Sequence, residues 1–239
     1  MNDDVSRETV DGTPPAPPSA QGVFARRLPL AEEFADLLTR EATVRGLIGP
    51  REAARVWERH ILNCAVISDL MPPSSTVCDI GSGAGLPGIA LAIRRPDILV
   101  TLVEPLLRRT TFLDLAASRM RLSNVSVHRG RAEDMHGVPE WSDGFDVVTS
   151  RAVAPMDRLT RWSLPLVGPG GVFLAMKGSS ARQELDAAAG VISALGGVDP
   201  EVVSVGSEWL GQPVMVVRMG KSDKYRHSRR RGSTSDDGR

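Results

Sequence analysis

Aromatic residues are scarce in this sequence: only 4% of its 239 positions hold Phe, Trp or Tyr, and Tyr occurs once. Most of the 41% hydrophobic content is therefore aliphatic, so a core must be built from Leu, Val, Ile and Ala. That content, together with 24% charged residues, is typical of a globular protein. The length allows one domain, or two at most.

Cysteine and histidine are also scarce. The two cysteines, Cys64 and Cys78, both stand in apolar surroundings. We therefore expect buried, reduced thiols, as in a cytoplasmic protein, and no disulfide framework. The four histidines are scattered along the chain without the spacing of metal ligands, so no metal site is predicted.

The chain lacks net charge, which is zero by formal count, and this argues against binding nucleic acid through bulk charge. No apolar run approaches the ~18 residues of a membrane span. The first residues, Met-Asn-Asp-Asp, lack the basic and apolar regions of a signal peptide. We expect a cytoplasmic protein with no membrane partner and, by default, a monomer.

The composition divides the chain into three parts. Residues 1–22 are rich in proline and poor in apolar groups, so they are predicted to be a disordered tail. Residues 23–220 are predicted to be a single domain, in which a helical cap (23–72) precedes an α/β core (73–220). Residues 221–239 are basic and polar, and they are predicted to be a second disordered tail.

Short apolar strands alternate with amphipathic helices throughout the core, which predicts a Rossmann-like, mostly parallel sheet with helices on both faces. The last two strands are separated only by a loop, so we expect a hairpin and one antiparallel strand among seven. The predicted strands are 76–80, 99–103, 124–128, 145–150, 171–176, 201–206 and 213–219. The predicted helices are 86–95, 106–121, 155–166 and 180–195, with a short turn at 133–136.

The most informative stretch is residues 76–88, Thr-Val-Cys-Asp-Ile-Gly-Ser-Gly-Ala-Gly-Leu-Pro-Gly. A strand ends at an acid, Asp79, and glycines follow at alternate positions, Gly81, Gly83 and Gly85. Because glycine lacks Cβ and tolerates positive φ, a flat or anionic ligand can approach this backbone closely. The stretch predicts a loop that binds a nucleotide-like cofactor.

Further candidates follow the other strands, because ligands of open α/β sheets bind beyond the carboxyl ends of the strands. Glu104 follows the second strand, where a carboxylate can accept both hydroxyls of a ribose. Glu133 and Asp134 follow the third strand, where an adenine could lie. Arg151 and Lys177 follow the fourth and fifth strands.

Two classes of cofactor are candidates for binding to this loop. A nicotinamide dinucleotide favours Gly-x-Gly-x-x-Gly, whereas the third glycine here comes one residue early. The negative charge of Asp79 would repel a pyrophosphate but attract an amino group or a sulfonium. With Glu104 and Glu133 following in strand order, the pattern favours S-adenosylmethionine. A dinucleotide-binding Rossmann protein is the alternative from another class.

Each candidate also has a purely structural interpretation. Asp79 could cap the amides of the loop, and Glu104 could begin the next helix. Glu133 could belong to an ordinary acidic first turn. Arg151 could be a structural salt-bridge partner, and for Lys177 we weigh the two interpretations equally.

Five stretches carry a resemblance to a known family: residues 59–64 (RHILNC), 79–88 (DIGSGAGLPG), 131–133 (RAE), 150–152 (SRA) and 177–178 (KG). With them the chain resembles the bacterial ribosomal RNA small subunit methyltransferase G family, also called glucose-inhibited division protein B. The resemblance implies a class I S-adenosylmethionine-dependent methyltransferase. Its implied product is N7-methylguanine at one position in a decoding-region loop of 16S ribosomal RNA, in naked RNA, the small subunit or an assembly intermediate.

The resemblance also implies that Gly81, Leu86, Ala132, Glu133 and Arg151 line the cofactor site. Lys177 and Arg151 are candidates for RNA contacts at its mouth, and Arg151 is alternatively a brace of the cofactor pocket. No catalytic acid or base is expected, because guanine N7 has a free lone pair and no proton. A methyltransferase acting on a small molecule and a non-catalytic ribosome-assembly binder are further alternatives.

Overall fold

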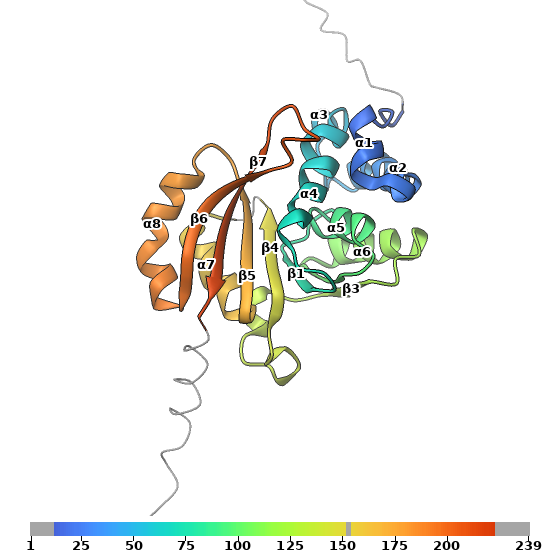
Figure 1. Cartoon of the computed structure of the whole chain (residues 1–239). Helices are drawn as coiled ribbons and strands as arrows, with labels where there is room; N and C mark the ends of the chain where they lie inside the picture. The colour runs from blue at the N-terminus through green and yellow to red at the C-terminus, as the bar shows by residue number, and fades with distance from the viewer. Residues whose placement is uncertain (1–11, 152–153, 223–239) are drawn as a thin grey trace, which may run out of the picture.

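A seven-stranded sheet with the order β3-β2-β1-β4-β5-β7-β6 organises the computed structural model, which describes residues 12–151 and 154–222 (Figure 1). The predicted tail residues 1–11 and 223–239 lie outside the described residues. The strands are β1 (Thr76–Ile80), β2 (Leu99–Val103), β3 (Val125–His128), β4 (Phe145–Arg151), β5 (Val167–Lys177), β6 (Gly197–Val205) and β7 (Val214–Lys221).

The sheet is parallel except at one strand. β1 pairs in parallel with β2 on one side and with β4 on the other, and β4 continues in parallel to β5. β7 runs antiparallel to both β5 and β6, with which it forms the terminal hairpin. The predicted seven-stranded sheet with one antiparallel strand is confirmed.

Helices cover both faces of the sheet, as the alternating pattern predicts. α5, α6 and the N-terminal helices share one buried cluster with one face, while α7 and α8 share a second cluster with the other. Along β1 the side chains alternate between these clusters, with Val77 in the first and Cys78 in the second. The helices are α1 (Pro18–Phe24), α2 (Leu28–Leu37), α3 (Pro50–Ala53), α4 (Leu62–Val66), α5 (Gly88–Arg94), α6 (Leu107–Arg119), α7 (Met156–Ser163) and α8 (Ala181–Ala194).

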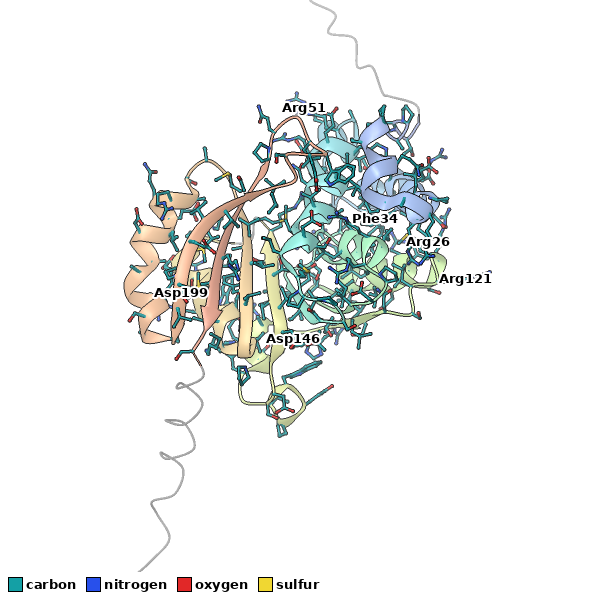
Figure 2. All side chains as sticks on the ribbon, in the orientation of Figure 1. Arg26, Phe34, Arg51, Arg121, Asp146 and Asp199 are labelled. Carbon is teal, nitrogen blue, oxygen red and sulfur yellow. The ribbon has the colours of Figure 1, made fainter. Side chains whose placement is uncertain are left out.

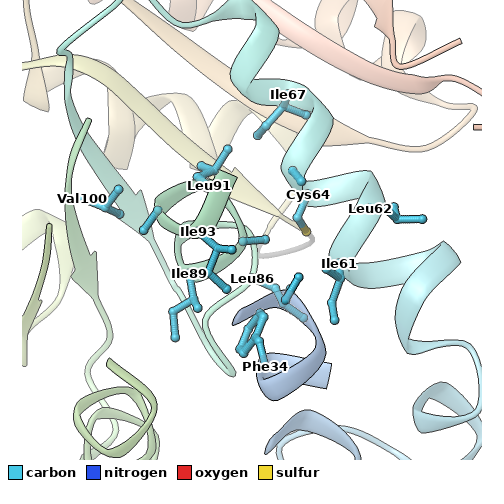
Figure 3. Close-up of a cluster of buried hydrophobic side chains, with 14 of the residues drawn as sticks. Phe34, Ile61, Leu62, Cys64, Ile67, Leu86, Ile89, Leu91, Ile93 and Val100 are labelled. Atoms are coloured by element: carbon cyan, nitrogen blue, oxygen red, sulfur yellow. The ribbon is translucent and has the colours of Figure 1, made fainter. Parts of the chain in front are cut away.

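The predicted helical cap packs on α5. Phe34 of α2 and Cys64 of α4 are fully buried in the same hydrophobic cluster as Ile89 and Ile93 of α5 (Figure 3). Fully burying a large apolar side chain such as that of Phe34 contributes about 1.5–3 kcal/mol. This shared hydrophobic cluster therefore fixes the cap onto the first βα unit. Charged side chains such as Arg121 lie at the periphery of the molecule (Figure 2). In the described part of the chain, no helix is long and apolar enough to cross a membrane.

The N-terminal prediction is wrong for residues 12–22. Disorder is predicted up to residue 22, but α1 begins within this segment and Ala20 is fully buried. The indole Nε1 of Trp57 donates a hydrogen bond to the carbonyl of Pro14 at 2.9 Å. Composition underestimated the order here because the apolar partner surface is provided by the cap, which is distant in sequence.

The loop of the terminal hairpin, residues 206–213, also reaches α1. A Cβ on Gly22 would lie 2.1 Å from the ring carbon Cζ3 of Trp209, so the indole lies directly against the α1 backbone. Leu210 and Trp209 pack onto the same hydrophobic cluster as the cap helices. The C-terminal hairpin thereby holds the N-terminal helix in place.

Gly22→Ala is expected to destabilise the fold, because the new methyl group would overlap the indole of Trp209. Overpacking of this kind typically costs ~1–3 kcal/mol. Gly190→Ala is the matched control: nothing lies within 4 Å of a Cβ at this position in α8, and alanine gains about 1 kcal/mol over glycine inside a helix. Urea unfolding measures both, and a Gly22→Ala variant as stable as Gly190→Ala would contradict the packing of Trp209 on α1.

Candidate functional site

The predicted site residues come together at one edge of the sheet. After β1 the chain builds β2 and β3 on one side, and it then returns to the other side of β1 with β4. This reversal makes the carboxyl ends of β1 and β4 the topological switch point, where open α/β sheets bind their ligands. The glycine loop follows β1 at this edge, Glu104 follows β2, and Ala132 follows β3. Arg151 is the last residue of β4.

The three alternating glycines have positive φ angles of 69°, 59° and 87° at Gly81, Gly83 and Gly85. Their environments differ. A Cβ on Gly83 would meet only the carbonyl oxygen of Gly81, 3.8 Å away, whereas one on Gly85 would lie 2.5 Å from Cδ1 of Ile89. Gly83 therefore leaves space for a ligand beside the backbone, and Gly85 is required by the packing of α5.

Asp79 lies beneath the loop rather than on its surface. Its side chain is fully buried, and Oδ2 accepts a hydrogen bond from the Gly88 N–H at 2.9 Å, which anchors the start of α5. A Cβ on Gly88 would lie 2.2 Å from Cδ2 of Leu102, so only glycine allows this approach. The other carboxylate oxygen, Oδ1, has no hydrogen-bond partner among the described residues. The structure therefore contains the contact that the structural interpretation of Asp79 predicts, in which its carboxylate accepts a hydrogen bond from a backbone amide of the loop.

Burial raises the pKa of Asp79 from 3.8 to about 7. The hydrogen bond from Gly88 and the positive charge of Arg151 oppose this rise, and the negative charge of Glu104 adds to it. The dominant cause is loss of hydration, which disfavours the charged form of any buried acid. The site therefore holds a carboxyl that nearby positive charge would readily ionise.

Glu104 connects the end of β2 to the glycine loop. Its carboxylate is 1% exposed; Oε2 accepts the Gly83 N–H at 3.1 Å, and Oε1 accepts the Leu106 N–H at 3.1 Å. Arg109 lies 3.3 Å from Oε2. Glu104 is not the N-cap of α6, which is Leu106, but it holds the amide of Leu106 ahead of the helix and also fixes the backbone of the loop. The contact with Gly83 is not evident from the sequence.

The remaining predicted cofactor contacts differ in exposure. Ala132 is buried at the start of the 3₁₀ turn Ala132–Met135, and Glu133 and Asp134 are exposed beside it. Leu86 is 6% exposed and packs in the cluster beneath the loop. Ala132 and Leu86 are thus part of the two hydrophobic clusters of the fold, whereas Glu133 is exposed to solvent.

Arg151 meets the cap at the end of β4. One guanidinium nitrogen donates to the carbonyl of Arg59 at 3.1 Å, and the other lies 2.8 Å from Nδ1 of His60. Two sequence motifs that are 91 positions apart are therefore joined at the site. Sequence reasoning did not pair His60 with Arg151, since no local pattern reports such a contact. Residues 152–153, which follow Arg151, lie outside the described residues.

Lys177 is not placed as an exposed RNA contact. Its side chain is 8% exposed, and Nζ donates to the carbonyl of Ala154 at 2.8 Å and pairs with Glu184 at 2.7 Å. The ammonium group lowers the pKa of Glu184. The structure therefore makes Lys177 a brace between β5, α8 and the segment that follows β4. Across the described residues, no group of three or more His, Cys, Asp or Glu side chains could hold a metal ion.

Solved structures of methyltransferases share this fold. A putative O-methyltransferase from Klebsiella pneumoniae matches with a TM-score of 0.55 at 15% identity, covering 85% of this chain and 99% of that one. A putative S-adenosyl-L-methionine-dependent methyltransferase from Methanococcus maripaludis matches with a TM-score of 0.54 at 15% identity, covering 81% and 92%. The fold is that of the Rossmann-like S-adenosylmethionine-dependent methyltransferases.

Similarity in sequence identifies the family to which the chain belongs within this class of methyltransferases. The family model described as rRNA small subunit methyltransferase G matches residues 27–212. The protein named ribosomal RNA small subunit methyltransferase G from Nocardioides sp. is 52% identical over 229 residues, 95% of this chain and 88% of the relative. The one from Mycolicibacterium smegmatis is 49% identical over 231 residues, 93% and 97%. The chain belongs to the ribosomal RNA small subunit methyltransferase G family, which confirms the resemblance seen in its motifs.

The raised pKa of Asp79 predicts a pH dependence of stability. An acid with a pKa of 3.8 when unfolded and about 7 when folded binds more protons in the folded state between these values. Its contribution to stability therefore decreases as pH rises from about 4 to about 7. Asp79→Asn keeps a carbonyl acceptor for the Gly88 N–H but cannot ionise.

We expect Asp79→Asn to gain stability relative to the unmodified protein between pH 4 and pH 7, by up to about 4 kcal/mol at ~1.4 kcal/mol per pKa unit. Urea unfolding of both proteins across this range measures the difference. A difference that does not change with pH would show that Asp79 titrates normally.

Proposed function

We propose that this enzyme methylates guanine N7 at one position in a decoding-region loop of 16S ribosomal RNA, with S-adenosylmethionine as the methyl donor. Membership in a family of ribosomal RNA small subunit methyltransferases, over residues 27–212, is the observation that carries the proposal. It favours an RNA acceptor over a small molecule. The arrangement of the glycine loop supports the choice of donor.

The residues at the switch point fit a cationic cofactor. Gly83 leaves open space above the loop, and two buried acids, Asp79 and Glu104, lie next to it. This negative environment would repel a pyrophosphate and attract a sulfonium or an amino group. The Glu104 carboxylate, which has about four acceptor positions, accepts three hydrogen bonds here and has one left for a ribose hydroxyl. We propose that the cofactor is held by Asp79, Gly81, Gly83, Leu86, Glu104, Ala132, Glu133 and Arg151.

The reaction requires little covalent chemistry from the side chains of the protein. S-adenosylmethionine, when bound, supplies both the methyl group and its leaving group. Guanine N7 has a lone pair and no proton, so we assign no catalytic acid or base. The contribution of the protein is to align the base with the methyl group and to exclude water, and positioning of this kind is worth roughly 7–11 kcal/mol.

Exposed arginines at the same edge offer contacts for RNA phosphates. Arg59 belongs to the cap segment that holds Arg151, Arg108 lies in the first turn of α6, and Arg131 precedes the turn at Ala132; all three are exposed. They take the place of Lys177 in the proposal, because its ammonium group is engaged within the fold. We propose that the enzyme acts as a monomer, in the cytoplasm, on ribosomal RNA that is free or in small-subunit particles.

A methylation map of 16S ribosomal RNA tests this function. RNA from cells in which the gene is deleted should lack N7-methylguanine at one position, and small subunits from those cells should regain it when incubated with the purified protein and S-adenosylmethionine. Unchanged methylation in the deletion strain would remove the proposal.

A further inference from the structure

Four side chains form a connected cluster where the cap meets the end of β4. His60 lies between two of them: its Nδ1 is 2.8 Å from a guanidinium nitrogen of Arg151, and its Nε2 is 2.9 Å from Oε2 of Glu52. The other oxygen of Glu52 accepts a hydrogen bond from Arg59 at 3.0 Å. Arg151 also donates to the backbone carbonyl of Arg59 at 3.1 Å, which closes the cluster.

The chemistry of these partners fixes the tautomer of His60. A guanidinium can only donate, so Nδ1 must be the acceptor and the ring proton resides on Nε2. Oε2 of Glu52 lies 2.9 Å from Nε2, but the geometry is not that of a hydrogen bond. Burial, followed by the positive charge of Arg151, lowers the pKa of His60 to about 4, and Glu52 opposes this shift only in part. His60 is therefore neutral near pH 7, as an acceptor for Arg151 requires.

The cluster determines where the guanidinium of Arg151 lies. A free arginine side chain has ~2 kcal/mol of rotamer entropy to lose when it is ordered. Here two hydrogen bonds that it donates to the cap hold it at the edge of the sheet that carries the glycine loop. His60 is itself 8% exposed, and its Nδ1 is occupied by the guanidinium of Arg151. It therefore influences the site through Arg151.

We propose that His60 is a positioning residue, which holds Arg151 at the cofactor site and links it to the anchored carboxylate of Glu52. The inference rests on the proposed function, because orientation of Arg151 matters only if this site binds the methyl donor. It predicts that the acceptor at the Nδ1 position is the essential part of His60, and that the donor at Nε2 is secondary.

A matched pair of substitutions separates these two atoms. His60→Asn places an amide near the Nδ1 position and keeps an acceptor for Arg151, whereas His60→Gln places its amide near the Nε2 position and keeps only the contact with Glu52. Binding of S-adenosylhomocysteine, measured by calorimetry, is expected to weaken at least tenfold in His60→Gln. His60→Asn should remain within about threefold of the unmodified protein, and so should Glu201→Gln, which removes the charge of a distant surface pair.

A double-mutant cycle shows whether His60 acts through Arg151. Arg151→Leu alone should weaken binding at least as much as His60→Gln, and the two substitutions together should weaken it no further, since coupled residues are not additive. Equal loss in His60→Asn and His60→Gln, additive losses in the double variant, or unchanged binding in Arg151→Leu would each overturn the positioning role. Absence of binding in the unmodified protein would instead overturn the proposed function.

Discussion

The hydrogen bond between the buried carboxylate of Asp79 and the Gly88 N–H is the contact on which the rest of the site depends. It connects the end of β1 to the start of α5 across the glycine loop. Burial removes water from the carboxylate of Asp79 and disfavours its charged form, which raises its pKa to about 7. The contact also explains why Gly88 has no side chain, since any Cβ would overlap Leu102 and Asp79 itself. Because the cap helices pack on α5, they too are placed by this contact.

Two further polar contacts fix the neighbouring strand ends in the same way. Glu104 holds the loop at Gly83 from the end of β2, and His60 holds Arg151 at the end of β4. Each is a buried or half-buried group paired with a donor or acceptor from another element. A site whose groups are positioned before the ligand arrives loses less entropy when it binds. These contacts leave open the space beside Gly83, where a Cβ would meet only the carbonyl oxygen of Gly81.

Much of the fold was predictable because buried parallel strands are short and continuously apolar. The bounds of β1 and β2 agree with the sequence prediction. β5 is longer than predicted: it begins at Val167, because pairing of Val167 with Phe145 in β4 overrides the turn signal of Gly168, Pro169 and Gly170. For the site, the position after each strand identified the candidates. What they touch depends on segments far away in the sequence, as with Lys177 and Ala154 or Arg151 and His60, and no local pattern encodes such contacts.

The central claim is that this loop binds S-adenosylmethionine rather than a dinucleotide. Calorimetric titration of the purified protein with S-adenosylhomocysteine, and separately with NAD, tests it most directly. We expect saturable binding of one S-adenosylhomocysteine per chain and no response to NAD. Binding of NAD without any response to S-adenosylhomocysteine would contradict it.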